Sequence, residues 1–367
     1  MRKMLFYGAG VFGKYAINRY KLYKMNRPEL KGFLDKKPKE DYEGYPVYCV
    51  DDIRMSDYDI VITMSNPYEI WKVYKELLNQ GCGKIYMFRN RANKVSENNM
   101  EFLTIECKEV YDLGECVLPY AEMHICDGCN LNCKGCTHFS PLFDWTMPSF
   151  DERIKDVKML KSKFSNIFGF HILGGEPLLN PQLGMYVREI RKLLTDTYIE
   201  IVTNGLLIPS LSNEILQNIK ENNVSIRISE YAPTTRLLPQ IRDVLEQQGI
   251  SYGISGFDDV KNMFGKPLSL SENSRYSHKC ISPGCVNIWN GKIARCPTLM
   301  YIKKFNEKFG LQLPCAGILE LNSDISGFNL LDFLEKEVPL CKHCVLNEFP
   351  WEQHKGEINL EDYVVID

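Results

Sequence analysis

The sequence contains no long apolar run and no excess of one charge. None of its segments approaches the roughly 20 consecutive apolar residues that a membrane-spanning helix needs. Its 44 Lys and Arg residues are balanced by 47 Asp and Glu residues, so the formal net charge is −3. A chain with this balance offers no broad basic surface for the phosphates of nucleic acid. We therefore expect neither a membrane nor a nucleic acid as partner.

Targeting signals and repeats are also missing. Residues 1–15 do not resemble a signal peptide, because their apolar run is short and ends in glycines that predict a turn. We find no repeat of fixed period and no low-complexity tract. A chain of 367 residues is long enough for two or three domains with their own cores. These features predict a cytoplasmic protein with several α/β domains.

Cysteine, in contrast, is abundant, with 14 residues in the chain. In a reducing compartment disulfides are rare, so clustered cysteines indicate metal or cofactor ligands. Four are scattered through the first third and are interpreted as small buried hydrophobes: Cys49, Cys82, Cys107 and Cys116. The others form two groups, at 126–136 and 280–344. Any metal chemistry is therefore expected in these two regions.

The first 90 residues alternate between short apolar strands and amphipathic helices. This alternation predicts a small Rossmann-like parallel sheet. The predicted strands cover 3–7, 31–34, 58–64 and 84–88, and the predicted helices cover 11–24 and 69–79. A polar stretch follows, and we predict a linker over 91–118. Within it, residues 100–118 could form either a hairpin or a connecting segment.

A second α/β alternation starts near residue 119 and predicts a partial (βα)6 barrel over 119–275. The active site of such a barrel lies at the C-terminal ends of its strands. Predicted strands are 120–125, 167–173, 198–203, 224–229 and 251–254, with helices at 151–164, 182–194, 212–221 and 234–248. Residues 276–367 are rich in Cys, Pro and Gly. We expect them to form a small domain held together by something other than a large core.

The first cysteine group follows the predicted strand 120–125. Cys129, Cys133 and Cys136 have C-x3-C-x2-C spacing. Three thiolates on one tight loop can bind three irons of a 4Fe–4S cluster, which leaves the fourth iron open to a small molecule. Two alternatives stay open on spacing alone. Cys126 and Cys129 could form half of a zinc site, or Cys126 could be the fourth ligand of an electron-transfer cluster.

Short motifs follow the next three predicted strands. Gly174-Gly175-Glu176 follows 167–173, Asn204 follows 198–203, and Ser229 ends 224–229. In this order, and with the cysteine loop before them, they resemble the radical SAM superfamily. The resemblance implies that Gly174, Gly175 and Glu176 bind the amino group of S-adenosylmethionine (SAM), while Asn204 and Ser229 reach its ribose or carboxylate.

The resemblance also implies the chemistry. SAM chelates the open iron, the reduced cluster splits it, and a 5′-deoxyadenosyl radical abstracts hydrogen from a substrate. The electron would come from a flavodoxin- or ferredoxin-type donor. The chain departs from the family in having Gly135, instead of an aromatic residue, before the third cysteine. Phe139 could take that place, although we favour packing as its role. Glu230 and Tyr231 either face the cavity or pack.

The second cysteine group is similar to the Twitch-type relative of the SPASM extension, which carries one auxiliary 4Fe–4S cluster. The residues that match its ligand positions are Cys280, Cys296, Cys341 and Cys344. Cys285 competes with Cys280 for one position, and a zinc site is the alternative. Between them, residues 288–294 predict a two-stranded hairpin with Asn290-Gly291 at its turn.

The N-terminal motif has the form G-x-G-x-x-G, with glycines at Gly8, Gly10 and Gly13 between a strand and a helix. An acid, Asp35, ends the next strand. This context predicts a nucleotide-binding turn with the phosphate at the helix N-terminus. Residues 44–47 resemble small nucleotide-sugar-binding domains of carbohydrate enzymes. A docking module that keeps the turn for its fold is the alternative.

Together these features predict a radical SAM enzyme that dehydrogenates or epimerises a sugar, nucleotide sugar or polyol. An auxiliary cluster could accept an electron from a substrate radical or hold the substrate. A peptide- or protein-modifying enzyme is the second hypothesis. A non-catalytic iron–sulfur carrier or zinc scaffold is the third, and it leaves Gly174-Gly175-Glu176 unexplained.

Overall fold

The computed structural model divides the chain into two compact units, Met1–Leu113 and Gly114–Asp367. The structure describes residues 3–24, 27–37, 40–64, 67–82, 84–89, 101–110, 114–255, 262–265, 267–272, 285–345 and 347–365. None of the described helices combines the length and apolar character needed to cross a membrane. The finer division into 1–90, 91–118, 119–275 and 276–367 stays a prediction.

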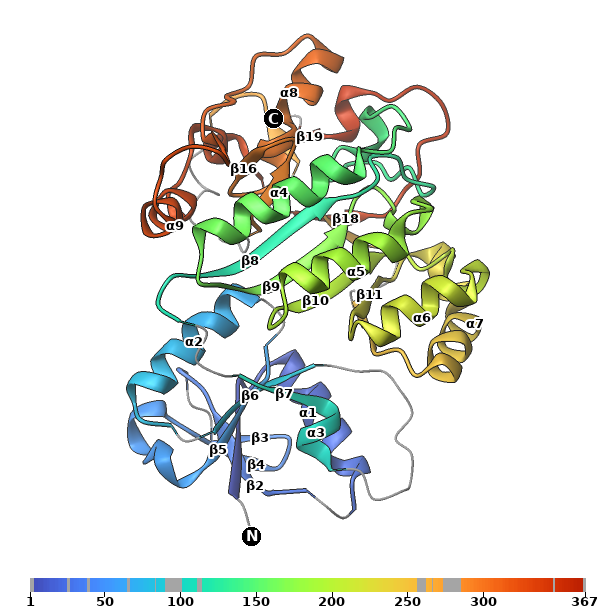
Figure 1. The fold of residues 1–367 in the computed structure, drawn as a ribbon. Helices are drawn as coiled ribbons and strands as arrows, with labels where there is room; N and C mark the ends of the chain where they lie inside the picture. Colours follow the sequence, from blue (N-terminus) through green and yellow to red (C-terminus); the bar gives the residue numbers. More distant parts are fainter. Residues whose placement is uncertain are drawn as a thin grey trace. The chain divides into compact units, whose positions relative to one another are not determined.

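The first unit is one sheet with strand order β3-β4-β2-β1-β5-β6-β7 (Figure 1). Its strands are β1 (Lys3–Tyr7), β2 (Glu29–Leu34), β3 (Asp41–Tyr42), β4 (Tyr45–Tyr48), β5 (Asp59–Ile62), β6 (Lys84–Phe88) and β7 (Cys107–Glu109). Its helices are α1 (Val11–Leu22), α2 (Pro67–Asn79) and α3 (Phe102–Glu106). Each neighbouring pair in the series β4-β2-β1-β5-β6 is parallel. This confirms the small parallel sheet.

Two parts of this sheet did not follow from the sequence. The hairpin β3–β4 extends the sheet at one edge. Strand β7, which follows α3, extends it at the other edge, and both α3 and β7 lie within the predicted linker 91–118. Phe102 explains the second addition, because its ring packs against Phe6 and Tyr20 in the core. Glu106, fully buried, accepts hydrogen bonds from Arg19 and from the Tyr23 hydroxyl at 2.7 Å. These long-range contacts hold α3 on the first unit.

The second unit has an eight-stranded sheet with order β12-β11-β10-β9-β8-β15-β16-β17. The strands are β8 (Val117–His124), β9 (Asn166–Leu173), β10 (Tyr198–Thr203), β11 (Ser225–Ser229), β12 (Tyr252–Ser255), β15 (Asn287–Trp289), β16 (Lys292–Ala294) and β17 (Ile318–Glu320). Each neighbouring pair in the series β12-β11-β10-β9-β8-β15 is parallel. The helices between them are α4 (Phe150–Lys163), α5 (Leu183–Leu193), α6 (Asn213–Glu221) and α7 (Ala232–Gln248).

This order confirms the parallel α/β arrangement of the central region. Helices α4 and α5 cover one face of β8 to β10, with α6 and α7 following along the sheet (Figure 1). Among the described residues four helices connect successive parallel strands, so the count of six βα units stays a prediction. The sequence set the helix ends through caps: Ser149 and Ser212 accept backbone N–H groups, and Gly249 ends α7 with φ +66°.

The C-terminal region has a larger core than expected. Helix α8 (Pro297–Phe309) buries Leu299, Tyr301 and Phe305. Phe139 stacks on Phe305 at 5.0 Å and contacts Tyr363, which confirms its packing role. The other elements are β13 (Asn262–Gly265), β14 (Leu268–Ser269), α9 (Gly327–Glu335), β18 (Asn347–Pro350) and β19 (Val364–Val365). The expectation of a region without a large core was therefore wrong, because its apolar residues are spread between irregular segments and lack a clear period.

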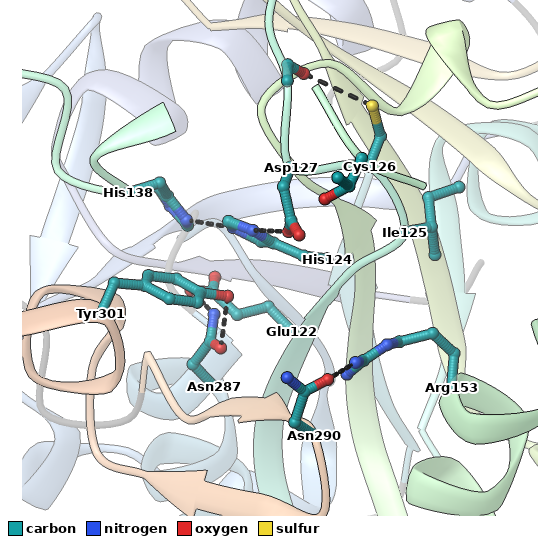
Figure 2. A network of polar contacts seen from close by, with 12 residues as sticks. Glu122, His124, Ile125, Cys126, Asp127, His138, Arg153, Asn287, Asn290 and Tyr301 are labelled. Carbon is teal, nitrogen blue, oxygen red and sulfur yellow. Dashed lines mark hydrogen bonds and ion pairs between the residues drawn. The ribbon is translucent and has the colours of Figure 1, made fainter. Parts of the chain in front are cut away.

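The predicted hairpin is confirmed as β15 and β16, with Asn290 and Gly291 at φ +51° and +75°. A buried Arg153 on α4 anchors this turn. Its guanidinium donates to the Asp156 carboxylate at 2.8 Å. It also donates to the Asn290 side chain (Figure 2). The other Asp156 oxygen accepts the Gly291 N–H at 2.9 Å. One ion pair thus fixes the hairpin to the helix.

Replacing Arg153 with alanine should destabilise the second unit strongly. The Asp156 charge would stay buried without its partner, which costs about 3–5 kcal/mol. Urea unfolding followed by tryptophan fluorescence would measure this loss. Lys155→Ala on the exposed side of the same helix is the control and should change stability by less than about 0.5 kcal/mol. Equal effects of the two substitutions would contradict the anchoring role.

Candidate active site

A pocket of about 210 Å³ lies at the C-terminal ends of the parallel strands of the second unit. Loops after β8, β9, β10 and β11 all contribute to it, as expected for a parallel α/β sheet. The residues that line it are Cys129, Leu131, Cys133, Cys136, Thr137, His138, Ser140, Leu173, Gly174, Gly175, Val202, Thr203, Asn204, Ser229 and Tyr231. The structure therefore brings Cys129, Cys133 and Cys136 together with most of the predicted SAM-binding residues.

The cysteine loop is tight and mostly buried. Asn132 and Gly135 both adopt left-handed backbone conformations, with φ +48° and +63°. These two bends let Cys129, Cys133 and Cys136 face the same pocket. Burial raises the pKa of the Cys129 thiol to about 12 and that of Cys133 still further. Free thiols here hold their protons, and binding of iron would displace them.

The donor set fits a cluster better than a single ion. Within the described ranges no three His, Cys, Asp or Glu side chains are gathered as ligands of one metal ion. In a 4Fe–4S cluster each thiolate binds a separate iron, so the sulfurs surround the cluster and do not converge on one point. Three thiols around one pocket meet that requirement.

Cys126 is placed apart from the other three. It is buried, and its thiol donates to the Gly128 carbonyl at 3.4 Å (Figure 2). It is not among the described residues that line the pocket. Burial raises its pKa to about 11. This position supports the interpretation of Cys126 as a bystander.

Gly174 and Gly175 allow the ends of β8 and β9 to touch. A Cβ on Gly174 would lie 2.1 Å from the Cys126 carbonyl oxygen, and one on Gly175 would lie 2.3 Å from that of Gly128. The Gly175 N–H donates to the Cys126 carbonyl at 2.8 Å. Both positions therefore need glycine for a close backbone approach, besides any contact with a ligand.

Glu176 lies behind the pocket wall instead of lining it. It is fully buried and accepts hydrogen bonds from Thr203 Oγ1 at 2.7 Å and the Asn204 N–H at 2.9 Å, besides one from Leu178. Burial raises the pKa of Glu176 to about 7, although these hydrogen bonds lower it. In this structure its carboxylate links the ends of β9 and β10.

Two further residues of the second unit that were predicted to bind SAM also line the pocket. Asn204 and Ser229 both line it, and the Asn204 amide donates to Asn130 Oδ1 at 2.7 Å, which ties it to the cysteine loop. Tyr231 also lines the pocket. Glu230 accepts a hydrogen bond from the Thr235 hydroxyl at 2.9 Å near the start of α7.

The second cysteine group is described in part. Cys280 lies outside the described residues. Cys296 caps α8, where its sulfur accepts from the Leu299 N–H at 3.5 Å, and the Cys341 sulfur accepts from the Val338 N–H at 3.5 Å. Cys344 ends the same short turn as Cys341. Cys285 precedes β15. The pKa of Tyr120 is raised first by burial, then by Glu122 and then by Cys285.

In the first unit the three motif glycines form the expected turn. Gly8 ends β1 with φ +114°, Gly10 precedes α1, and a Cβ on Gly13 would lie 2.3 Å from the Gly8 carbonyl oxygen. The Asp35 carboxylate accepts the N–H groups of Ala9 at 3.0 Å and Lys37 at 2.9 Å. Asp35 therefore supports the turn itself. Its role toward a ribose stays a prediction.

A polar layer one step below the pocket did not follow from the sequence. His171, Glu200 and Arg227 each lie two residues before a pocket-lining residue of the same strand, so they share its face. Arg227 donates to both Glu200 oxygens at 2.8 and 3.1 Å, and His171 Nε2 lies 3.1 Å from Glu200. Although burial raises it, the pKa of Glu200 is held below its usual range by Arg227 and His171. Ionisable residues within buried parallel strands were the available signal.

A second missed group stacks beside the cysteine loop. His138, which lines the pocket, shares a 2.7 Å hydrogen bond with His124, and the His124 ring stacks on Tyr301 at 4.6 Å (Figure 2). The Tyr301 hydroxyl donates to Asn287 at 3.0 Å, and the Asn287 amide donates to Glu122 at 3.2 Å. Tyr301 and Asn287 of the C-terminal region thus contact His124 and Glu122 of β8.

One family model matches the segment of the chain that carries this site. Residues 123–247 match the family model described as the radical SAM superfamily. That segment carries the cysteine loop and the motifs after β9, β10 and β11. The match does not define which reaction the chain catalyses.

Among individual proteins, the chain is similar to GTP 3′,8-cyclases. It is 27% identical to that of Campylobacter jejuni over 40% of this chain and 44% of the relative. It is 29% identical to that of Clostridium acetobutylicum over 42% and 46%. The aligned segment thus spans less than half the length of these relatives.

Solved structures show weaker likeness. BtrN in complex with AdoMet and 2-DOIA has a TM-score of 0.38 at 15% identity, covering 61% of this chain and 92% of BtrN. SuiB of Streptococcus suis bound to S-adenosylmethionine has a TM-score of 0.34 at 13% identity, covering 76% and 73%. Native anSMEcpe with bound AdoMet has a TM-score of 0.30 at 17% identity, covering 37% and 44%.

The buried Glu176 generates a prediction about pH. Because its pKa is raised from 4.5 to about 7, the folded protein keeps a proton that the unfolded chain releases between these values. Glu176 therefore lowers stability as pH rises through this window, by up to about 3 kcal/mol. Glu176→Gln lacks this titration but loses one accepted hydrogen bond, which costs about 1–3 kcal/mol.

The stability advantage of the natural protein over Glu176→Gln should thus be larger at pH 5 than at pH 8. Urea titrations at both pH values would measure it. Glu214→Gln, which changes an exposed carboxylate of α6, is the matched control and should show no such difference. An advantage of the natural protein that grows from pH 5 to pH 8 would contradict the raised pKa.

Proposed function

We propose that this chain is a radical SAM enzyme that abstracts hydrogen from a polyhydroxylated small molecule: a sugar, nucleotide sugar or polyol. One observation carries the enzyme part of the proposal. The three spaced cysteines share a pocket with Gly174, Gly175, Asn204 and Ser229 at the carboxyl ends of four parallel strands. An electron carrier needs no such pocket beside its cluster.

The residues of the pocket have separate roles in this proposal. Cys129, Cys133 and Cys136 would hold a 4Fe–4S cluster, which supplies the electron that cleaves SAM. The backbone at Gly174 and Gly175 would receive the methionine part of SAM. Asn204 and Ser229 would bind its ribose or carboxylate. Glu176 would act from behind, by fixing the Asn204 backbone that shapes the pocket.

The polar layer below the pocket supports a substrate rich in hydroxyl groups. Hydroxyls both donate and accept hydrogen bonds, and this layer presents both kinds of partner in Arg227, Glu200 and His171. Arg227 and His171 keep 18% and 12% of their side-chain surface exposed, so they can contact a ligand. The N-terminal turn, if it binds a nucleotide sugar, would add a second contact of the same class.

A second cluster would complete the enzyme. In the proposal Cys296, Cys341 and Cys344 bind it with Cys280 or Cys285, and it accepts the electron that a dehydrogenated substrate radical must lose. Epimerisation would instead require a hydrogen donor on the opposite face of the substrate. The net reaction therefore depends on whether this second cluster forms.

Single cysteine substitutions test the radical SAM assignment. After anaerobic reconstitution with iron and sulfide, the protein should release 5′-deoxyadenosine from SAM when dithionite is added. Cys133→Ala should lower this release by at least about 100-fold, because one iron would lose its protein ligand. Cys126→Ala is the matched control and should retain it. Product is measured by liquid chromatography with mass spectrometry.

Two outcomes of that experiment would overturn the assignment. Absence of 5′-deoxyadenosine from a fully reconstituted natural protein would favour a non-catalytic iron–sulfur carrier. Loss of activity in Cys126→Ala together with retention in Cys133→Ala would exclude the proposed ligand set.

Deuterated substrates test the substrate class. The protein is incubated with SAM, dithionite and sugars or nucleotide sugars that are deuterated at every carbon. The deuterium content of the 5′-deoxyadenosine is then measured by mass spectrometry. Deuterium should appear in the 5′-deoxyadenosine for a true substrate, because its hydrogen moves to the 5′ carbon. A deuterated peptide library provides the opposing test, and label from a peptide alone would favour the peptide-modifying hypothesis.

A further inference from the structure

The segment after β18 lies along the cysteine loop as an added extended strand. The Lys134 N–H donates to the Glu352 carbonyl at 2.9 Å, and the His354 N–H donates to the Asn132 carbonyl at 3.0 Å. Cys133 and Gln353 pair between them in an antiparallel bridge. The left-handed bend at Asn132, φ +48°, lies within this pairing. The chain thus returns more than 200 residues later to cover the loop.

Trp351 is the residue of this segment that contacts a predicted ligand. Its indole Nε1–H donates to the Cys133 sulfur at 3.1 Å. The Trp351 ring also packs beside Tyr231, with ring centroids 6.0 Å apart. Both rings pack against the buried side chains of Leu131 and Cys133. Trp351 is only partly exposed, so surrounding protein limits competition from water for the sulfur.

Ion pairs hold the segment where this hydrogen bond can form. Lys134, directly after Cys133, lies 3.1 Å from the Glu352 carboxylate and 3.2 Å from that of Asp362. His354 is buried and stacks on Tyr363. The indole is therefore fixed by backbone pairing on one side and by side-chain contacts on the other.

From this geometry we infer that Trp351 is a positioning residue of the SAM-binding cluster, whose N–H raises the reduction potential of that cluster through Cys133. The inference rests on the proposed function, since it requires Cys133 to bind iron. A hydrogen-bond donor to a ligand sulfur stabilises the extra negative charge of the reduced state more than the oxidised state. The donor therefore makes it easier for an external reductant to load the electron.

Trp351→Phe removes the N–H and keeps an aromatic ring beside Cys133. The reconstituted full-length protein is titrated against redox mediators, and the signal that changes when SAM is added is followed by electron paramagnetic resonance. That signal separates the open cluster from an auxiliary one. At a fixed potential the ratio of reduced to oxidised open cluster should fall about tenfold, which is a shift of about 59 mV to more negative potential for one electron.

Trp145→Phe is the matched control, because it makes the same substitution at an indole that is 66% exposed. It should leave the potential unchanged. If Trp351→Phe does not retain its cluster, 3-benzothienylalanine at position 351 replaces the N–H with sulfur in a ring of nearly the same shape. This second variant should give the same negative shift.

The outcomes separate this inference from the proposed function. A natural protein that binds a cluster but never responds to SAM would overturn the proposed function. A SAM-responsive cluster whose potential is the same with Trp351, phenylalanine or benzothienylalanine would overturn the role of Trp351 and leave the function standing. A shift to more positive potential in the variants would also overturn it, because solvent access and not the N–H would then dominate.

Discussion

The close approach of two backbone segments, at the ends of β8 and β9, is the constraint on which the site depends. Gly175 and Glu176 donate their N–H groups to the carbonyls of Cys126 and Gly128, at 2.8 and 2.9 Å. Only glycine at 174 and 175 leaves room for this contact. The pairing continues the strand ladder past the sheet and places the cysteine loop beside the end of β10. Without it the thiols would have no fixed position relative to the pocket.

Buried carboxylates extend the same arrangement. Glu176 holds the start of the loop after β10, and Glu200 holds His171 and Arg227 together one layer lower. Each buried charge has several hydrogen-bond partners, as the cost of burial requires. The layer beneath the pocket is therefore polar and held by several contacts at once. It suits a ligand that must be held by directional contacts while reactive chemistry takes place above it.

Much of the fold could be predicted from local patterns. The strands β1, β5, β6 and β8 to β12, and the helices α1 and α4 to α7, follow from periodicity, caps and turn glycines, because these signals act over a few residues. The hairpin at Asn290 also follows from its turn. Elements that depend on distant partners did not follow. Helix α3 is held by Phe6, Arg19 and Tyr23, and the core around α8 gathers residues from 139 to 364.

The site shows the same division. The sequence by itself determined the three-cysteine loop and the order of the motifs after it, since spacing along one loop decides which thiols can bind one cluster. Tertiary structure decided that Glu176 faces inward to Thr203 and Asn204, and that the indole of Trp351 donates to Cys133. Contacts between residues far apart in sequence leave no local period or spacing. They exist only once the chain has folded and brought those segments together.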